Sequence, residues 1–130
     1  MVYEKKDPFE NRMRRLARES LALQELRFAA EYAGASDQEL VECIRLWKKW
    51  LGHTPHAAEM IGGKYILIRF GGDWRRALRL GGMAMAGPPP KPDNRRIYKL
   101  EIQRQKLIFQ GKISQDEQTI MQLVMEAQNE

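Results

Sequence analysis

The fold of this chain is decided by residues 51–82, which read LGHTPHAAEMIGGKYILIRFGGDWRRALRLGG. Three glycine doublets, at 62–63, 71–72 and 81–82, divide this stretch into short segments. Glycine is typical of helix ends because it adopts a left-handed backbone conformation at little cost. The pattern therefore predicts a compact series of short helices.

Each segment of this stretch has its own helix signal. Pro55, a residue type favoured in the first turn of a helix, predicts a short helix over residues 56–60. Residues 64–70 are rich in the aromatic and β-branched types that favour strands, but no other segment offers a partner strand. We therefore predict a short helix there too, and Asp73 is a natural N-cap for another over residues 74–80.

Two longer helices are predicted before this stretch. Residues 9–32 follow Pro8, contain no glycine or proline, and are rich in helix-forming residue types. Ser36 followed by Glu39 is a capping box, which predicts a second helix that ends near Leu51. The expected buried positions are Met13, Leu16, Leu23, Leu26, Phe28 and Ala30 in the first helix and Leu40, Ile44, Trp47 and Leu51 in the second.

A proline-rich segment separates these helices from the end of the chain. Residues 83–92 include three consecutive prolines, which predict an extended, polyproline-like linker. Beyond it, residues 95–109 predict a helix, and Ser114 followed by Glu117 predicts a further helix over residues 115–127. These last two helices would form a helical hairpin.

The expected fold class is therefore all-α, with a helix-turn-helix-like cluster of short helices at its centre. With 130 residues, the chain is long enough for one compact core and has little room for a second. The expected parts are an N-terminal helix in residues 1–35, a helical module in residues 36–82, a linker in residues 83–94 and a C-terminal hairpin in residues 95–130.

Composition narrows the class of protein. Hydrophobic residues make up 43% of the chain and charged residues 30%, which predicts a chain that folds in water. No segment approaches the roughly 20 apolar residues of a spanning helix, and the N-terminal end is charged, so we expect neither a membrane partner nor secretion. Cys43 is the single cysteine and cannot form an internal disulfide, which favours the cytoplasm.

Basic charge is concentrated in the middle of the chain. Residues 61–87 contain five basic side chains against one acidic one, and residues 88–112 contain seven against two. Residues 113–130 contain four acidic side chains and no basic one. Because blocks of opposite charge attract different partners, residues 61–112 are the expected site for a polyanion such as DNA.

Several uncommon residues occur in the order of a known module. They are Trp47, Leu51, Gly52-His53-Thr54-Pro55, Arg69-Phe70-Gly71, Trp74, Ala77-Leu78 and Gly81. Through them, residues 39–82 resemble the homing-endonuclease-associated repeat, a short helical module found beside HNH-type nuclease domains. The resemblance implies a DNA-associated fold and places Lys64, Tyr65, Ile68 and Arg69 on the helix before the Phe-Gly turn.

A basic row is expected on the last short helix. Arg75, Arg76 and Arg79 would lie on adjacent turns. An ordinary solvated face is the simpler interpretation, but the basic residues after the linker and the resemblance favour non-specific contact with duplex phosphates. Tyr65 would stack on a base if exposed, although an aromatic residue beside Ile66 is more often part of the core. The predicted nucleic-acid-binding residues are Lys64, Tyr65, Ile68, Arg69, Arg75, Arg76, Arg79, Lys91, Arg95, Arg96 and Lys99.

The sequence has no recognisable catalytic motif. His53 and His56 are close in sequence, but Pro55 lies between them and no carboxylate or thiolate was expected at metal-ligand spacing. The glycine doublets lack the Lys-Ser/Thr pair of a phosphate-binding loop. We therefore expect no enzyme activity, no cofactor and no metal.

Two functions remain as hypotheses. The first is a DNA-binding accessory or regulatory protein, of phage or bacterial type, that contacts double-stranded DNA through residues 39–82. The alternative is a protein–protein adaptor or inhibitor of a nucleic-acid machine, which docks or forms a homo-oligomer through residues 9–32 and 95–127. The acidic C-terminal end and the methionines, which adapt to varied surfaces, motivate the alternative.

Overall fold

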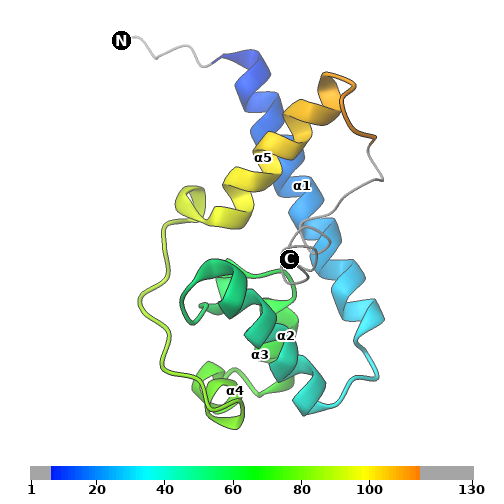
Figure 1. Cartoon of the computed structure of the whole chain (residues 1–130). Helices are drawn as coiled ribbons and strands as arrows, with labels where there is room; N and C mark the ends of the chain where they lie inside the picture. The colour runs from blue at the N-terminus through cyan, green and yellow to red at the C-terminus, as the bar shows by residue number, and fades with distance from the viewer. Residues whose placement is uncertain (1–6, 115–130) are drawn as a thin grey trace.

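The structure, a computed structural model, describes residues 7–114, and all of their regular secondary structure is helical (Figure 1). This confirms the expected all-α class. In chain order the elements are α1 (Pro8–Glu31), α2 (Asp37–Leu51), the 3₁₀ turn η1 (Ala57–Glu59), α3 (Gly63–Arg69), α4 (Trp74–Leu80), the 3₁₀ turn η2 (Pro92–Asn94) and α5 (Arg96–Phe109).

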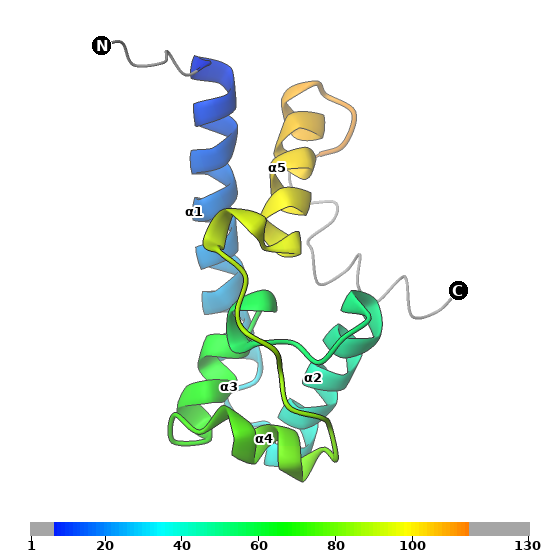
Figure 2. The same ribbon diagram turned by 90° about the vertical axis from the view of Figure 1, so that its left-hand side faces the viewer.

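The helices form two connected parts. At one end of the molecule α1 and α5 lie side by side, and at the other α2, α3 and α4 gather near the last turns of α1 (Figures 1 and 2). The pair is antiparallel, because the Phe9 and Phe109 ring centroids are 5.1 Å apart while Arg18 donates to the Tyr98 hydroxyl at 3.2 Å. Residues 83–91 have no regular secondary structure and connect α4 to this pair.

The buried face of α1 differs from the predicted one. Leu23 and Leu26 are 47% and 68% exposed, so the predicted apolar stripe is wrong at these positions. That stripe mixed two faces of the helix, since Leu23 lies roughly 200° around the axis from Leu21. The buried residues, spaced three or four apart on one face, are Met13, Ala17, Leu21, Gln24 and Phe28.

α2 begins and ends as its sequence predicts. The Ser36 hydroxyl accepts the Glu39 N–H at 3.1 Å, and the Ser36 N–H donates to the Glu39 carboxylate at 2.9 Å. This backbone hydrogen bond lowers the pKa of Glu39. Leu40, Ile44 and Trp47 are fully buried, as expected, whereas Leu51 is half-buried.

The two predicted short helices after the Gly-Gly turns are confirmed as α3 and α4, and the Asp73 carboxylate caps α4 by accepting the Arg76 N–H at 3.2 Å. The helix predicted for residues 56–60 is instead the single 3₁₀ turn η1, capped by His56 and not begun by Pro55. α3 starts directly against this turn, because a Cβ atom on Gly63 would lie 1.9 Å from the Ala57 carbonyl oxygen.

A buried polar cluster joins α1 to α5, and the sequence analysis did not predict it. Glu101 is 0% exposed, and the Arg104 Nε donates to its two carboxylate oxygens at 2.9 and 3.1 Å. Gln105 and Gln24 also donate to this carboxylate, at 2.8 and 3.4 Å. The cluster is satisfied within the fold, so that a buried charge is tolerated between the two helices.

The predicted C-terminal hairpin is only partly visible. Its first helix is α5, and Gly111 follows with a left-handed φ of +72°. The second helix, predicted for residues 115–127, lies outside the described residues, so the hairpin stays a prediction. Within residues 7–114, no helix combines the length and the apolar character needed to cross a membrane.

Candidate nucleic-acid interface

Three of the predicted residues form an exposed basic row on α4. The opposite side of this short helix is buried, so Arg75, Arg76 and Arg79 lie at the surface. The Arg76 guanidinium lies over the Phe70 ring, 5.7 Å from its centroid. Within the described part of the chain, none of these arginines forms an ion pair with a carboxylate. Their charge is therefore open to a partner.

The four predicted residues on α3 differ in how exposed they are. Lys64 is exposed, and Ile68 is 67% exposed. Tyr65 and Arg69 are half-buried, and Arg69 donates to the Ala35 carbonyl at 2.8 Å and to the Tyr65 hydroxyl at 3.2 Å. Arg69 also pairs with a carboxylate at the start of α2, at 3.4 Å. Its guanidinium therefore holds α3 against α2.

The remaining predicted residues lie at the end of the linker and at the start of α5, and Figure 2 shows the start of α5 in a different part of the molecule from α4. The Arg96 guanidinium stacks on the Trp50 ring, 4.1 Å from its centroid, and donates to the Trp50 carbonyl at 2.9 Å. Arg95 donates to a carbonyl of η2 at 3.0 Å. Lys91 and Lys99 are exposed. The predicted set therefore divides into the arginine row of α4, the four residues of α3 and a group near the start of α5, and Arg96 of this last group contacts α2 at Trp50.

Basic residues of α2, which the sequence analysis did not single out, lie beside α4. Arg45, Lys48 and Lys49 line a hollow of about 440 Å³ together with Gly81 and Gly82. Arg45 donates to the Gly81 carbonyl and so ties α2 to the end of α4. The spacing of these three cations, at i, i+3 and i+4, was the signal that could have found them. We define the α2–α4 basic surface as Arg45, Lys48, Lys49, Arg75, Arg76 and Arg79.

A second hollow at α4 has a volume of about 380 Å³, and Arg76, Arg79 and Leu80 contribute to its lining. It also includes Asp37 at the start of α2, whereas the first hollow includes Gly52 at the end of α2. No heavy atom lies within 4 Å of a Cβ built on Gly52 or Gly82. A ligand can therefore approach the backbone at these glycines without meeting a side chain.

Three carboxylates of residues 7–114 lie at the α2–α4 basic surface. Asp37 lines the second hollow and pairs with Arg69, Glu42 pairs with Arg45 at 3.1 Å, and Asp73 accepts the Arg76 N–H at 3.2 Å. These carboxylates number fewer than the cations of the surface, so its local potential is positive. Arginine is also suited to phosphate, because its planar guanidinium can donate two parallel hydrogen bonds.

The cysteine and the histidines, which could take part in nucleophilic or metal chemistry, are not part of the α2–α4 basic surface. The Cys43 thiol is buried, and burial raises its pKa, so that the unreactive protonated form is favoured. The expectation that no carboxylate accompanies the histidines is wrong, because the His53 Nε2 is 2.8 Å from the Glu59 carboxylate. Among residues 7–114, no three potential ligands of the His, Cys, Asp or Glu types form a metal-binding cluster.

Comparison with protein-family models, with curated proteins and with solved structures gave no match to this chain. The resemblance of residues 39–82 to the homing-endonuclease-associated repeat therefore stays a prediction.

Proposed function

We propose that this protein binds double-stranded DNA through the α2–α4 basic surface, as an accessory or regulatory protein that performs no catalysis itself. The observation that supports this proposal is the exposed arginine row of α4, together with three further cations of α2 that line a hollow with the end of α4. The cations come from helices tied together at Gly81, so their relative positions are set before binding.

The expected mode of binding is contact with phosphates and not with base edges. Each neutralised phosphate releases condensed counterions, so the logarithm of the binding constant falls with the logarithm of salt concentration with a slope of roughly −0.9 per contact. Four to five contacts would give a slope of about −4. Affinity of this kind is typically about 1–100 μM at physiological salt and depends little on sequence.

Fluorescence anisotropy with a labelled random duplex, at about 50 and about 200 mM salt, tests the proposal. The triple variant Arg75→Gln/Arg76→Gln/Arg79→Gln should bind more weakly and reduce the salt slope by about 3. The matched control is Arg14→Gln/Arg15→Gln/Arg27→Gln, which removes the same charge from exposed positions of α1. Equal loss of affinity in the two variants would mean that net charge, and not this surface, determines binding.

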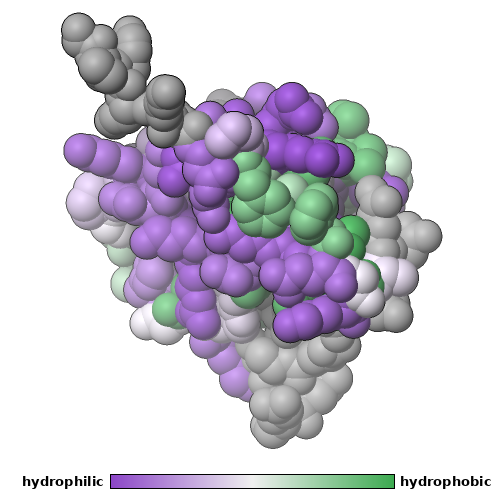
Figure 3. All heavy atoms as spheres, turned by 90° about the horizontal axis from the view of Figure 1, so that it is seen from above, coloured by the Kyte–Doolittle hydropathy of each residue, from purple (hydrophilic) through white to green (hydrophobic). Residues whose placement is uncertain are grey.

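The second candidate function is the protein–protein adaptor, and one observation favours it. Leu107 and Phe109 are 37% and 57% exposed at the end of α5, and Phe109 contacts the half-buried Phe9. Figure 3, which views this end of the molecule, shows apolar side chains at the surface among hydrophilic ones. Exposed apolar groups of this kind are typical of protein-binding surfaces.

Sedimentation velocity distinguishes the adaptor from the DNA-binding protein. If the apolar end of α5 mediates self-association, Phe109→Ser should shift an oligomer towards monomer and leave duplex binding unchanged. The control is Leu26→Ser, which removes an apolar side chain of α1 that is 68% exposed and lies outside the end of α5. A wild-type protein that is monomeric at all concentrations and captures no partner would rule out this candidate.

A further inference from the structure

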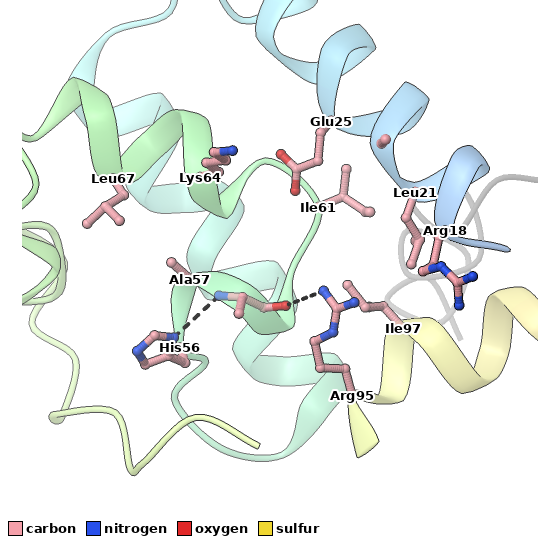
Figure 4. A pocket seen from close by; sticks show the side chains of 12 residues that line it. Arg18, Leu21, Glu25, His56, Ala57, Ile61, Lys64, Leu67, Arg95 and Ile97 are labelled. Atoms are coloured by element: carbon pink, nitrogen blue, oxygen red, sulfur yellow. Dashed lines mark hydrogen bonds between the residues drawn. The ribbon is translucent and has the colours of Figure 1, made fainter. Parts of the chain in front are cut away.

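A pocket of about 520 Å³ lies where α1, η1, α3 and the start of α5 meet (Figure 4). Part of its lining is apolar, with Leu21 from α1, Ile61, Leu67 from α3 and Ile97 from α5. The volume falls in the range of small-molecule sites, roughly 300–1,000 Å³. The pocket is therefore large enough for the body of a small organic molecule.

Three cations also line the pocket. Figure 4 shows Arg18 and Arg95 on the side of Ile97, and Lys64 on the opposite side next to Glu25. The Glu25 carboxylate is already engaged, because it accepts the Gly62 N–H at 2.9 Å. Burial raises the pKa of Glu25, and the charges of Lys64 and Arg95 oppose this rise. The balance of charge in the lining therefore favours an anion.

These cations retain donors for a ligand. Arg18 donates to the Tyr98 hydroxyl at 3.2 Å, and Arg95 donates to a carbonyl of η2 at 3.0 Å. A guanidinium has five N–H donors, so each arginine keeps several. Lys64 is exposed and forms no ion pair with another residue of the described range.

We propose that this pocket binds a small organic anion, with an apolar body against Leu21, Ile61, Leu67 and Ile97 and a single carboxylate or phosphate group held by Arg18 and Arg95 on the Ile97 side. The site goes beyond the proposed DNA binding, since it shares no residue with the α2–α4 basic surface. Arg95 was predicted to contact nucleic acid, and the pocket assigns it a different ligand.

The first experiment compares two fluorescent probes that differ in charge. Anilinonaphthalene sulfonate has an apolar body with one anionic group, whereas N-phenylnaphthylamine has a similar body without the anion. The sulfonate should bind in a saturable manner with one site per chain, and tighter than the neutral probe. Displacement by decanoate or by decyl phosphate, but not by decanol, would then identify which anionic group the site prefers.

Variants locate the bound probe. Arg18→Gln/Arg95→Gln should weaken sulfonate binding roughly tenfold, because each ion pair near the surface accounts for up to about fivefold in affinity. Its control is Arg14→Gln/Arg15→Gln, which removes the same charge from α1 outside the pocket. Ala22→Phe fills the pocket from an exposed position of α1, and its control is Ala30→Phe on the same helix.

The outcomes separate this site from DNA binding. Loss of probe binding in Ala22→Phe, with duplex anisotropy unchanged, would support the pocket whether or not the α2–α4 basic surface binds DNA. Equal binding of the two probes would overturn the anion assignment. Unchanged sulfonate binding in Ala22→Phe, in a variant that melts at the wild-type temperature, would overturn the site itself.

Discussion

Glu101→Leu is expected to destabilise the protein strongly, because it removes the carboxylate from a buried ion pair. Glu101 is 0% exposed and Arg104 is 7% exposed, and the shortest N–O distance between them is 2.8 Å. In the variant, the Arg104 guanidinium keeps the Ser20 hydroxyl at 3.2 Å but loses the Glu101 carboxylate. Gln105 and Gln24 each lose one acceptor as well.

The magnitude follows from the burial of the pair. Removal of one partner from a buried ion pair typically costs about 3–5 kcal/mol of unfolding free energy. Since small proteins are stable by about 5–15 kcal/mol, this loss is a large share of the total. It should lower the melting temperature by roughly 10–20 °C. Glu101→Leu/Arg104→Met, which removes both charges, should recover most of the stability.

Urea denaturation followed by circular dichroism measures these effects. The control is Glu19→Leu, which removes a carboxylate from the exposed pair with Arg15, where the N–O distance is 3.9 Å and the side chains are 65% and 62% exposed. This control should cost less than about 1 kcal/mol. A loss below about 1 kcal/mol in Glu101→Leu, or a double variant no more stable than the single one, would refute the argument from charge burial.

Two further predictions concern close packing and protonation. Gly63→Ala should lower the free energy of unfolding by more than about 2 kcal/mol, because the new Cβ would meet the Ala57 backbone. The control is Gly34→Ala, whose new Cβ would meet nothing within 4 Å and which should be close to neutral in the same urea titration. Equal stability of these variants would contradict the direct contact between α3 and η1. Burial raises the pKa of Glu25 above its usual 4.5 in the folded protein, so the folded state binds more protons than the unfolded state at a pH just above 4.5. The stability of the wild-type protein therefore falls as the pH rises above 4.5. Glu25→Gln has no carboxylate to ionise and keeps an oxygen that accepts the Gly62 N–H. The stability of this variant relative to wild type should therefore increase between about pH 4 and about pH 7. A stability difference that does not change with pH would show that the buried carboxylate is not the cause.

The elements that could be predicted are those decided by chemistry within a few residues. The Ser36–Glu39 capping box and the Asp73 cap each satisfy N–H groups one turn away, so the sequence alone indicates where α2 and α4 begin. The turn η1 is different. The backbone becomes extended at Met60 and so ends the turn, and the close contact of Gly63 with Ala57 leaves no room for a further helical turn.

The candidate sites were predictable only in part, for a related reason. Buried neighbours on α4 orient the arginine row, and those neighbours are evident from the helical period. Arg45, Lys48 and Lys49 join that row only because Gly81 packs on α2, where a Cβ atom would lie 2.5 Å from Val41. The pocket lining comes from four separate elements, and no sequence spacing relates them.

The sequence by itself therefore determined the helical class, the short helices after the glycine doublets and the exposed arginine row of α4. Each depends on hydrogen bonds and periodicity along a single segment. The tertiary structure decided which face of α1 is buried, where Glu101 finds its partners and that Arg96 packs on Trp50 of α2. These features depend on which surfaces of distant segments pack together, because burial and charge pairing are set by neighbours in space and not by neighbours along the chain.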